Sequence, residues 1–159
     1  MREIEDKVEQ FFAGTWSPLE STIGSTPIEP GVYALSFTHE DLTKEAIDCR
    51  RIDYVGMSRS QGGVRSRLKQ FLRGVRVGEG HSAGNRFNRE GAVQLGLAQT
   101  EKLSEAKFWV SCLAISCEVE KGLRNADDLR KIGHVECLEK YILAYFYERM
   151  GHEPKLNKQ

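Results

Sequence analysis

The chain has 159 residues, of which 40% are hydrophobic and 29% are charged, so we expect one globular domain and exclude collagen-like, coiled-coil and wholly disordered chains. The formal net charge is zero, which argues against a general polyanion binder. No run approaches the roughly 18 apolar residues of a membrane span, and the acidic start, Met1-Arg-Glu-Ile-Glu-Asp, differs from a secretory signal, so we expect a cytoplasmic protein without a membrane partner.

The first third of the chain predicts one helix and two strands. Apolar residues recur at helical spacing over residues 2–13, which indicates a short amphipathic helix that ends near Gly14. Residues 14–30 are rich in Pro, Ser, Thr and Gly and are typical of a connector. Alternating apolar residues then predict strands at 31–37 and 51–56, with a polar loop or short helix between them.

The middle of the chain contains the clearest helical pattern. After Gly62 and Gly63, apolar side chains fall at offsets of 0, 4, 7, 8 and 11 residues, which is the stripe of a helix packed on a core. These side chains are Val64, Leu68, Phe71, Leu72 and Val75. Residues 77–84 are glycine-rich, and residues 85–99 are compatible with a further helix.

The remainder of the chain predicts a buried strand and a final helix. Residues 108–115 form an apolar run of strand length, residues 119–133 are polar, and residues 134–150 have a helical apolar face. The connection between the first two strands is short for a helical crossover, so the pattern favours an α+β fold with antiparallel pairing. We expect an N-terminal helix and connector at 1–29 and the main domain at 30–159.

Charge is unevenly distributed along the neutral chain. Residues 1–49 carry a formal charge of −7, residues 50–89 carry +8 and residues 90–159 carry −1. Nine of the ten cations in the middle segment are arginines, whose planar fork suits bidentate phosphate contacts. Two interpretations remain open: a solvated surface paired with acidic segments elsewhere, or a phosphate-binding face on an otherwise acidic body.

Five sequence pieces, taken in order, resemble the GIY-YIG nuclease superfamily. They are Gly31-Val-Tyr33, Tyr54-Val-Gly56, Val64-Arg-Ser-Arg-Leu68, Leu138-Glu-Lys-Tyr-Ile-Leu143 and Pro154-Lys-Leu-Asn157. Each piece alone is a weak signal, whereas their order is fairly specific and covers roughly residues 30–157. The resemblance implies a small three-stranded antiparallel sheet flanked by helices, with residues 30–159 as the nuclease domain.

The resemblance also implies a set of site residues. The implied catalytic residues are Tyr33, Tyr54, Arg67, His81, Glu139 and Asn157. Tyr33 would be the general base, assisted by Tyr54, and Glu139 would hold one divalent metal ion, Mg²⁺ or Mn²⁺. The cations that we predict to contact more distant phosphates are Arg59, Arg65, Lys69, Arg73, Arg76 and Arg86.

The chain departs from the family pattern at two places. The loop between the two tyrosines is about ten residues longer than is usual, which indicates an insertion at residues 38–50. A histidine is common four residues after the arginine, where this chain has Phe71. We therefore expect His81 or a tyrosine to take the place of that histidine.

Hydrolysis of a phosphodiester requires a positioned water, a base for its proton, and positive charge near the phosphate and the leaving oxygen. Tyrosine has a pKa near 10, so a tyrosine base at pH 7 requires a depression of about three units, or roughly 4 kcal/mol, from arginine or metal charge. By helix geometry, Arg67 and Glu139 lie roughly 80° and 70° from the middle of their apolar stripes. Both side chains are therefore expected at the border between core and solvent.

These observations predict a metal-dependent endonuclease that hydrolyses DNA phosphodiester bonds and acts as a monomer or as a dimer on its substrate. The main alternative is a nucleic-acid-binding module on the same scaffold that does not cleave, because Phe71 replaces the usual histidine. A protein-interaction domain with accidental motif matches is a third possibility.

Overall fold

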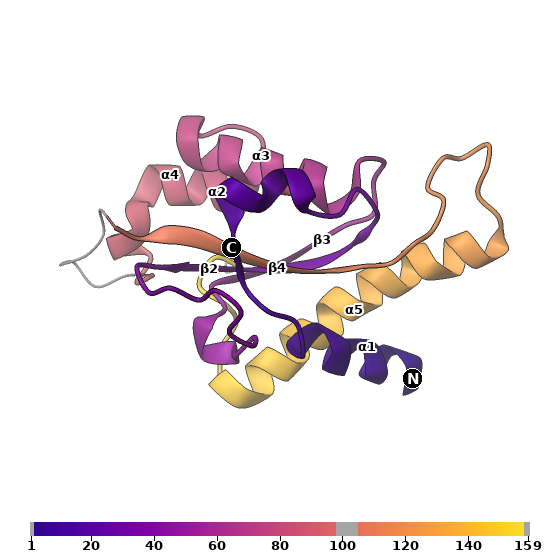
Figure 1. Cartoon of the computed structure of the whole chain (residues 1–159), viewed down its shortest axis with the longest axis horizontal. Helices are drawn as coiled ribbons and strands as arrows, with labels where there is room; N and C mark the ends of the chain where they lie inside the picture. The colour runs from indigo at the N-terminus through magenta and orange to yellow at the C-terminus, as the bar shows by residue number, and fades with distance from the viewer. Residues whose placement is uncertain (1, 98–104, 158–159) are drawn as a thin grey trace.

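The computed structural model describes residues 2–97 and 105–157, with helices on both faces of an antiparallel sheet (Figure 1). In spatial order β1-β4-β2-β3, the sheet comprises β1 (Ser17–Pro18), β4 (Lys107–Ala114), β2 (Gly31–Thr38) and β3 (Tyr54–Ser58). The predicted α+β class with antiparallel pairing is therefore confirmed.

The helices form two layers. One face of the sheet carries α1 (Arg2–Phe12) and α5 (Ala126–Met150). The other face carries α2 (Leu19–Thr22), α3 (Gly63–Val77) and α4 (Ser82–Gln94). Two short 3₁₀ helices, η1 (Ile23–Ser25) and η2 (Cys49–Arg51), lie in the connections. No helix of the described ranges is long and apolar enough to cross a membrane.

Strand β2 is buried on both faces because each face has its own core. Val32 and Ala34 belong to the core under α1 and α5, whereas Tyr33, Leu35 and Phe37 belong to the core under α3 and α4. Side chains alternate between the two faces of a strand, so both sets must be largely apolar. The near-continuous apolar run in the sequence follows from this burial.

The sheet has one strand more than the three predicted. Ser17 and Pro18 pair with Val110 and Trp109 at the outer edge of β4. Two residues in a Pro-rich connector show no alternation, so a sequence pattern does not reveal this strand. The predicted strand at 51–56 also begins later, at Tyr54, because the preceding residues form η2.

Two helix starts differ from the predictions, and capping explains the first of them. The last helix begins at Ala126 rather than near residue 134, since the Asn125 side chain accepts hydrogen bonds from the amides of Asp127 and Asp128. The Asp128 carboxylate accepts from the Asn125 amide in return, which completes a capping box. The helix expected at 85–99 begins at Ser82 and ends at Gln94. Residues 98 and 99 of that prediction lie outside the described residues.

Residues 38–50, the segment predicted to be an insertion, contribute to the core on the α1 and α5 side. Its side chains Leu42, Ile47 and Cys49 are buried against that core. Its backbone is tied to the chain after α1, because the Ile47 amide donates to the Gly14 carbonyl at 3.1 Å. The insertion thus extends the hydrophobic core beneath the sheet.

Close contact between α3 and α4 depends on two glycines. A Cβ at Gly84 would lie 2.4 Å from the Phe71 carbonyl oxygen and 3.1 Å from the Gly74 Cα. The two backbones therefore approach more closely than any side chain at position 84 permits. This contact fixes the start of α4, and with it His81, beside the sheet.

Candidate active site

Tyr33 and Tyr54 lie on neighbouring strands at the centre of the candidate site. In the antiparallel register Tyr33 faces Gly56, two residues from Tyr54, and the two tyrosine rings are 6.0 Å apart between centroids. A Cβ at Gly56 would lie 2.7 Å from the Tyr33 hydroxyl oxygen and 2.6 Å from the Tyr54 Cε1. Gly56 therefore leaves the space in which the two phenols meet.

His81 completes the cluster from the start of α4. It is the N-cap residue of that helix, and its Nε2 lies 3.2 Å from the Tyr33 hydroxyl. The imidazole is fully buried, and it packs against Phe71 with the ring centroids 5.4 Å apart. The histidine predicted to replace the one missing at Phe71 thus lies directly beside that position.

Arg67 and Glu139 act electrostatically on the same two phenols. Arg67, from α3, lowers the pKa of both Tyr33 and Tyr54, whereas Glu139, from α5, raises both pKa values. Arg67 also lowers the pKa of His81. Coulomb interactions of this kind require short distances or low local dielectric, so these side chains converge on one region of the protein.

Burial is the largest influence on the pKa of Tyr33, Tyr54 and His81. Desolvation raises the pKa of Tyr33 well above its ordinary value and also raises the pKa of Tyr54. Arg67 lowers the pKa of both tyrosines, as expected of a nearby arginine, but it only partly offsets desolvation, so the depression that a tyrosine base requires depends on the charge of a bound metal. Burial and Arg67 together lower the pKa of His81 to about 4, so the imidazole is neutral at pH 7.

The polar groups of Tyr54, Tyr33 and His81 form a row that leads from the solvent to the interior of the protein. Tyr54 is half-buried and lines a cleft, whereas Tyr33 and His81 are fully buried. A hydrogen bond between the two phenol side chains raises the pKa of Tyr33 and lowers that of Tyr54. These shifts are those of a Tyr33 hydroxyl that donates to Tyr54 and keeps its own proton.

The cleft beside Tyr54 has a volume of about 810 Å³ and lies between α4, α5 and the C-terminal segment. Of the predicted catalytic residues, Tyr54, Glu139 and Asn157 line it. The pattern missed several other polar side chains that also line it, namely Ser82, Asn85, Arg89, Lys140 and Glu153. These residues lie on helical turns and near the chain end, where no motif marks them.

Asn157 holds the C-terminal segment against the sheet. Its side-chain oxygen accepts from the Val55 amide at 2.8 Å, and its side-chain nitrogen donates to the Val55 carbonyl at 2.7 Å. The Leu156 amide donates to the Asp53 carbonyl at 2.8 Å. Both polar groups of the Asn157 side chain thus bind backbone next to Tyr54, which is a positioning role.

Most of the cations predicted to contact nucleic acid have partners within the protein. Three form ion pairs with acidic side chains: Arg59 with Glu136, Arg73 with Glu79, and Arg76 with Glu20. Arg65 donates to the Thr26 carbonyl, Arg86 donates to the Lys155 carbonyl, and Lys69 is exposed on α3. Of this predicted set, Arg86 lines the cleft. The acidic residues therefore neutralise much of the predicted basic face.

A single divalent cation fits the chemistry of the cleft. Glu139 lines it with a side chain that is 16% exposed, and its nearest cation, the Lys140 ammonium, lies 3.5 Å away on a largely exposed side chain. No group of three His, Cys, Asp or Glu side chains gathers anywhere in residues 2–97 and 105–157. Mg²⁺ commonly binds through one or two carboxylates and several waters, and Glu139 offers one such ligand.

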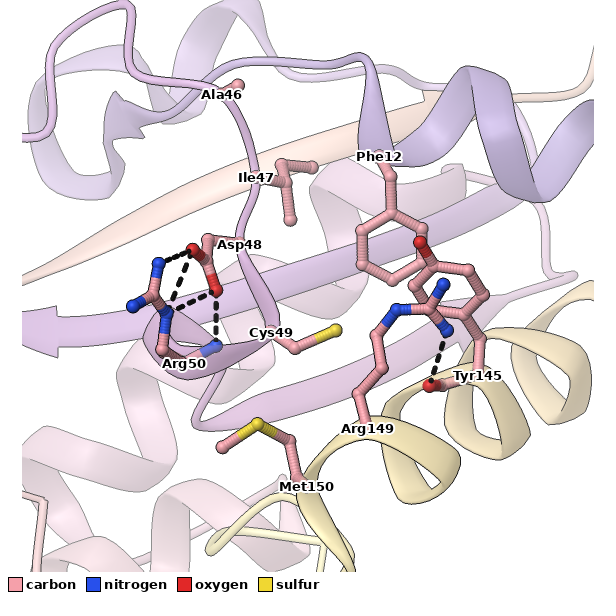
Figure 2. Close-up of a pocket in the computed structure, with 9 residues that line it drawn as sticks. All are labelled: Phe12, Ala46, Ile47, Asp48, Cys49, Arg50, Tyr145, Arg149 and Met150. Carbon is pink, nitrogen blue, oxygen red and sulfur yellow. Dashed lines mark hydrogen bonds and ion pairs between the residues drawn. The ribbon is translucent and has the colours of Figure 1, made fainter.

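A second cavity, of about 570 Å³, lies on another flank of α5 (Figure 2). Its wall includes Arg149, whose guanidinium carbon lies 3.2 Å from the centroid of the Tyr145 ring, and Tyr145 packs on Phe12. The neighbouring Asp48 and Arg50 pair with each other. None of the predicted catalytic residues lines this cavity, so the candidate site is the cleft beside Tyr54.

Comparison with known proteins finds no family model, no curated protein and no solved structure that matches the chain. The resemblance to GIY-YIG nucleases therefore rests on the residues quoted above and remains a prediction.

Proposed function

We propose that the protein is a metal-dependent endonuclease of the GIY-YIG type that hydrolyses DNA phosphodiester bonds. The observation that carries this proposal is that Arg67 and Glu139, on two helices far apart in the sequence, influence the pKa of the same two phenols, and that one of these phenols, Tyr54, lines a cleft together with Glu139. A cation-binding carboxylate, an arginine and a proton acceptor are the parts that this hydrolysis requires.

Arg67 and Glu139 have separate roles in the proposed reaction. Arg67 braces the phosphate that is cut, through charge-assisted hydrogen bonds to its non-bridging oxygens. Glu139 holds the divalent metal, which when bound supplies positive charge to the phosphate and the leaving oxygen. Asn157 keeps β3 and the C-terminal segment together, so that Tyr54 stays at the cleft.

The proton of the attacking water passes along the buried rings. Tyr54 meets the water at the cleft and accepts its proton as the hydrogen bond between the two phenols reverses. Tyr54 then passes its own phenol proton to Tyr33, and Tyr33 passes its proton to His81 Nε2, which becomes an imidazolium. His81 is neutral at pH 7 because its pKa is lowered to about 4. Protonating a group with that pKa at pH 7 costs about 4 kcal/mol, and the high pKa of water adds to the cost of this transfer unless a bound metal lowers that pKa.

A binding module without cleavage is the second candidate function. It is favoured by the Lys140 ammonium, which lies 3.5 Å from the Glu139 carboxylate and competes with a metal ion for it. The raised pKa of both tyrosines also favours it, because burial opposes their ionisation. Such a module would bind nucleic acid in a salt-dependent manner and leave it intact.

Cleavage assays with a matched pair of variants separate these functions. Supercoiled plasmid and single-stranded DNA are incubated with Mn²⁺, with Mg²⁺ or with EDTA, beside Glu139→Gln and Glu148→Gln. Both residues lie on α5, but Glu148 is exposed and lies outside the cleft. We expect metal-dependent cutting that Glu139→Gln reduces at least about a hundredfold and Glu148→Gln leaves unchanged.

Circular dichroism melting of both variants checks that the fold survives, since neither side chain belongs to the core. Salt-sensitive binding without cutting in either metal would select the binding module. Cutting that persists in EDTA, or that Glu139→Gln leaves intact, would contradict the proposed metal site.

A further inference from the structure

The cleft has largely exposed cations at its rim and less exposed reactive groups, Tyr54 and Glu139, in its walls. At the rim, the Arg89 and Lys140 side chains are 72% and 75% exposed. In the walls, the Glu139 side chain is 16% exposed and Tyr54 is half-buried, whereas Tyr33 and His81 lie beside Tyr54 with no exposed surface and do not line the cleft. A phosphate must therefore pass below the rim to come near the reactive groups.

The two rim cations lie on different helices that line the cleft, Arg89 on α4 and Lys140 on α5. Their pairs with neighbouring acids are long, at 3.4 Å for Arg89 with Glu90 and 3.5 Å for Lys140 with Glu139. Both cations nevertheless remain largely exposed, so a phosphate can approach them and compete with Glu90 and Glu139 for them. A strand that lies in the cleft would meet both of them.

The walls also offer a buried donor and apolar contact surface. Among the described residues, the Arg86 Nε is buried without a hydrogen-bond partner, and Arg86 lines the cleft. Leu143 and Leu156 contribute apolar surface to the same walls. A cationic groove with apolar or aromatic surface is the usual means of holding one strand of nucleic acid.

We propose that this cleft accepts one unpaired nucleic-acid strand, held on either side of the reacting phosphate by Arg89 and Lys140. The inference rests on the proposed function and adds the class of substrate to it. The cleft volume of about 810 Å³ is in the range of pockets that enclose one small organic molecule, so it admits a nucleotide or two and excludes a duplex. The scissile strand must therefore be single, frayed or in a flap.

Cleavage of four matched probes tests the substrate class. The probes are one labelled DNA sequence as a single strand, as a blunt duplex and as a single-stranded flap on a duplex, and the same sequence as single-stranded RNA. In Mn²⁺ we expect cleavage of the single strand and the flap at least about ten times faster than the duplex. Equal or faster cleavage of the duplex overturns the proposal. The RNA probe shows whether the cleft prefers single-stranded DNA or single-stranded RNA.

Binding gives a readout that does not depend on cleavage. In the Glu139→Gln background, fluorescence anisotropy measures the affinity for the single strand and the duplex, with Arg89→Ala, Lys140→Ala and Lys121→Ala added separately. Lys121 is an exposed cation outside the cleft and serves as the charge-matched control. We expect each rim variant to weaken single-strand binding about three- to tenfold and to reduce its salt dependence, and the control to change neither.

The two readouts separate the inference from the proposed function. Preferential single-strand binding that depends on both rim residues, without any cutting, supports this inference and contradicts the nuclease. Cutting of the duplex in preference to the single strand supports the nuclease and overturns the inference. Rim variants that bind as the Lys121→Ala control does also overturn it.

Discussion

At the scale of single residues, two buried groups titrate in opposite directions. Burial lowers the pKa of His81 to about 4 and raises the pKa of Asp53 to about 6. Between pH 6.5 and pH 4 the unfolded chain binds the His81 proton more readily, so acid lowers the free energy of unfolding. Between pH 6 and pH 4 the folded protein binds the Asp53 proton more readily, so acid raises the free energy of unfolding. The two contributions therefore partly cancel.

The substitution Asp53→Asn separates the contribution of Asp53 to the pH dependence of stability from that of His81. The carboxylate of Asp53 accepts from the Phe37 amide at 2.8 Å, and an asparagine oxygen can keep that bond. We expect the variant to be more stable than the unaltered protein by about 1 to 2 kcal/mol at pH 7, a gain limited because the side chain is partly exposed. Urea unfolding between pH 4 and pH 7 measures the difference.

The raised pKa of Asp53 determines how the stability difference between the variant and the unaltered protein changes with pH. Below about pH 4 Asp53 is protonated in both folded and unfolded chains, so the variant and the unaltered protein are expected to be equally stable. The advantage of the variant should appear as the pH rises through about 6. A stability difference that stays constant across this range would show that Asp53 ionises as freely in the folded protein as in the unfolded chain.

Sequence reasoning succeeded for side chains whose position follows from helix phase and failed where burial decides. Arg67 and Glu139 were predicted at the border of their helices, and Glu139 lines the cleft with a partly buried side chain. The desolvation that raises the pKa of Tyr33 was not anticipated, because it arises from burial in the core between the sheet and α3 and α4. Local sequence contains no measure of that desolvation.

At the scale of elements, the contact between α3 and α4 positions His81. Gly84 lies in the first turn of α4, and a Cβ there would lie 2.4 Å from the Phe71 carbonyl oxygen. The positions of the added Cβ and of the Phe71 carbonyl oxygen are both set by the backbone, so a methyl group at position 84 must push the two helices apart. The glycine-rich stretch at 77–84, which the sequence analysis left without a role, thus contains the residue that allows this packing.

Gly84→Ala should therefore destabilise the protein and displace His81 from Tyr33. We expect a loss of about 1 to 3 kcal/mol in the free energy of unfolding, together with a fall in cleavage rate. Gly133→Ala, on α5, is the control because a Cβ there meets nothing within 4 Å. Alanine in a helix is favoured over glycine, so this control should gain about 0.5 to 1 kcal/mol. Equal effects of the two substitutions would show that α4 does not depend on Gly84.

The elements that the sequence predicted best have strong periodicity. The helix stripe from Val64 to Val75 corresponds to α3, and the three apolar runs correspond to β2, β3 and β4. The early start of α5 was missed although its capping residues, Asn125 and Asp128, are visible in the sequence. Strand β1 was missed because pairing with β4, a long-range contact, is what makes it a strand.

At the scale of the whole molecule, one face of the sheet is buried by helices, and the candidate site lies at an edge of the sheet. The helices α1 and α5 and the insertion at 38–50 bury one face of the sheet. The cleft lies at the edge where β3, α4, α5 and the C-terminal segment meet. Four segments far apart in the chain thus form one cleft. The order of short motifs named Tyr54, Glu139 and Asn157 as site residues, but it indicated neither the size of the cleft nor the cations at its rim.

The most direct test of the central claim is the rate of metal-dependent DNA cleavage by Tyr54→Phe, Arg67→Ala and Glu139→Gln, measured side by side with the unaltered protein in Mn²⁺. These residues come from β3, α3 and α5. If they form one catalytic site, each variant should lose at least about tenfold in rate while its melting temperature changes little, and combining two substitutions should cost much less than the product of their separate effects. Variants that cleave as fast as the unaltered protein would contradict the claim.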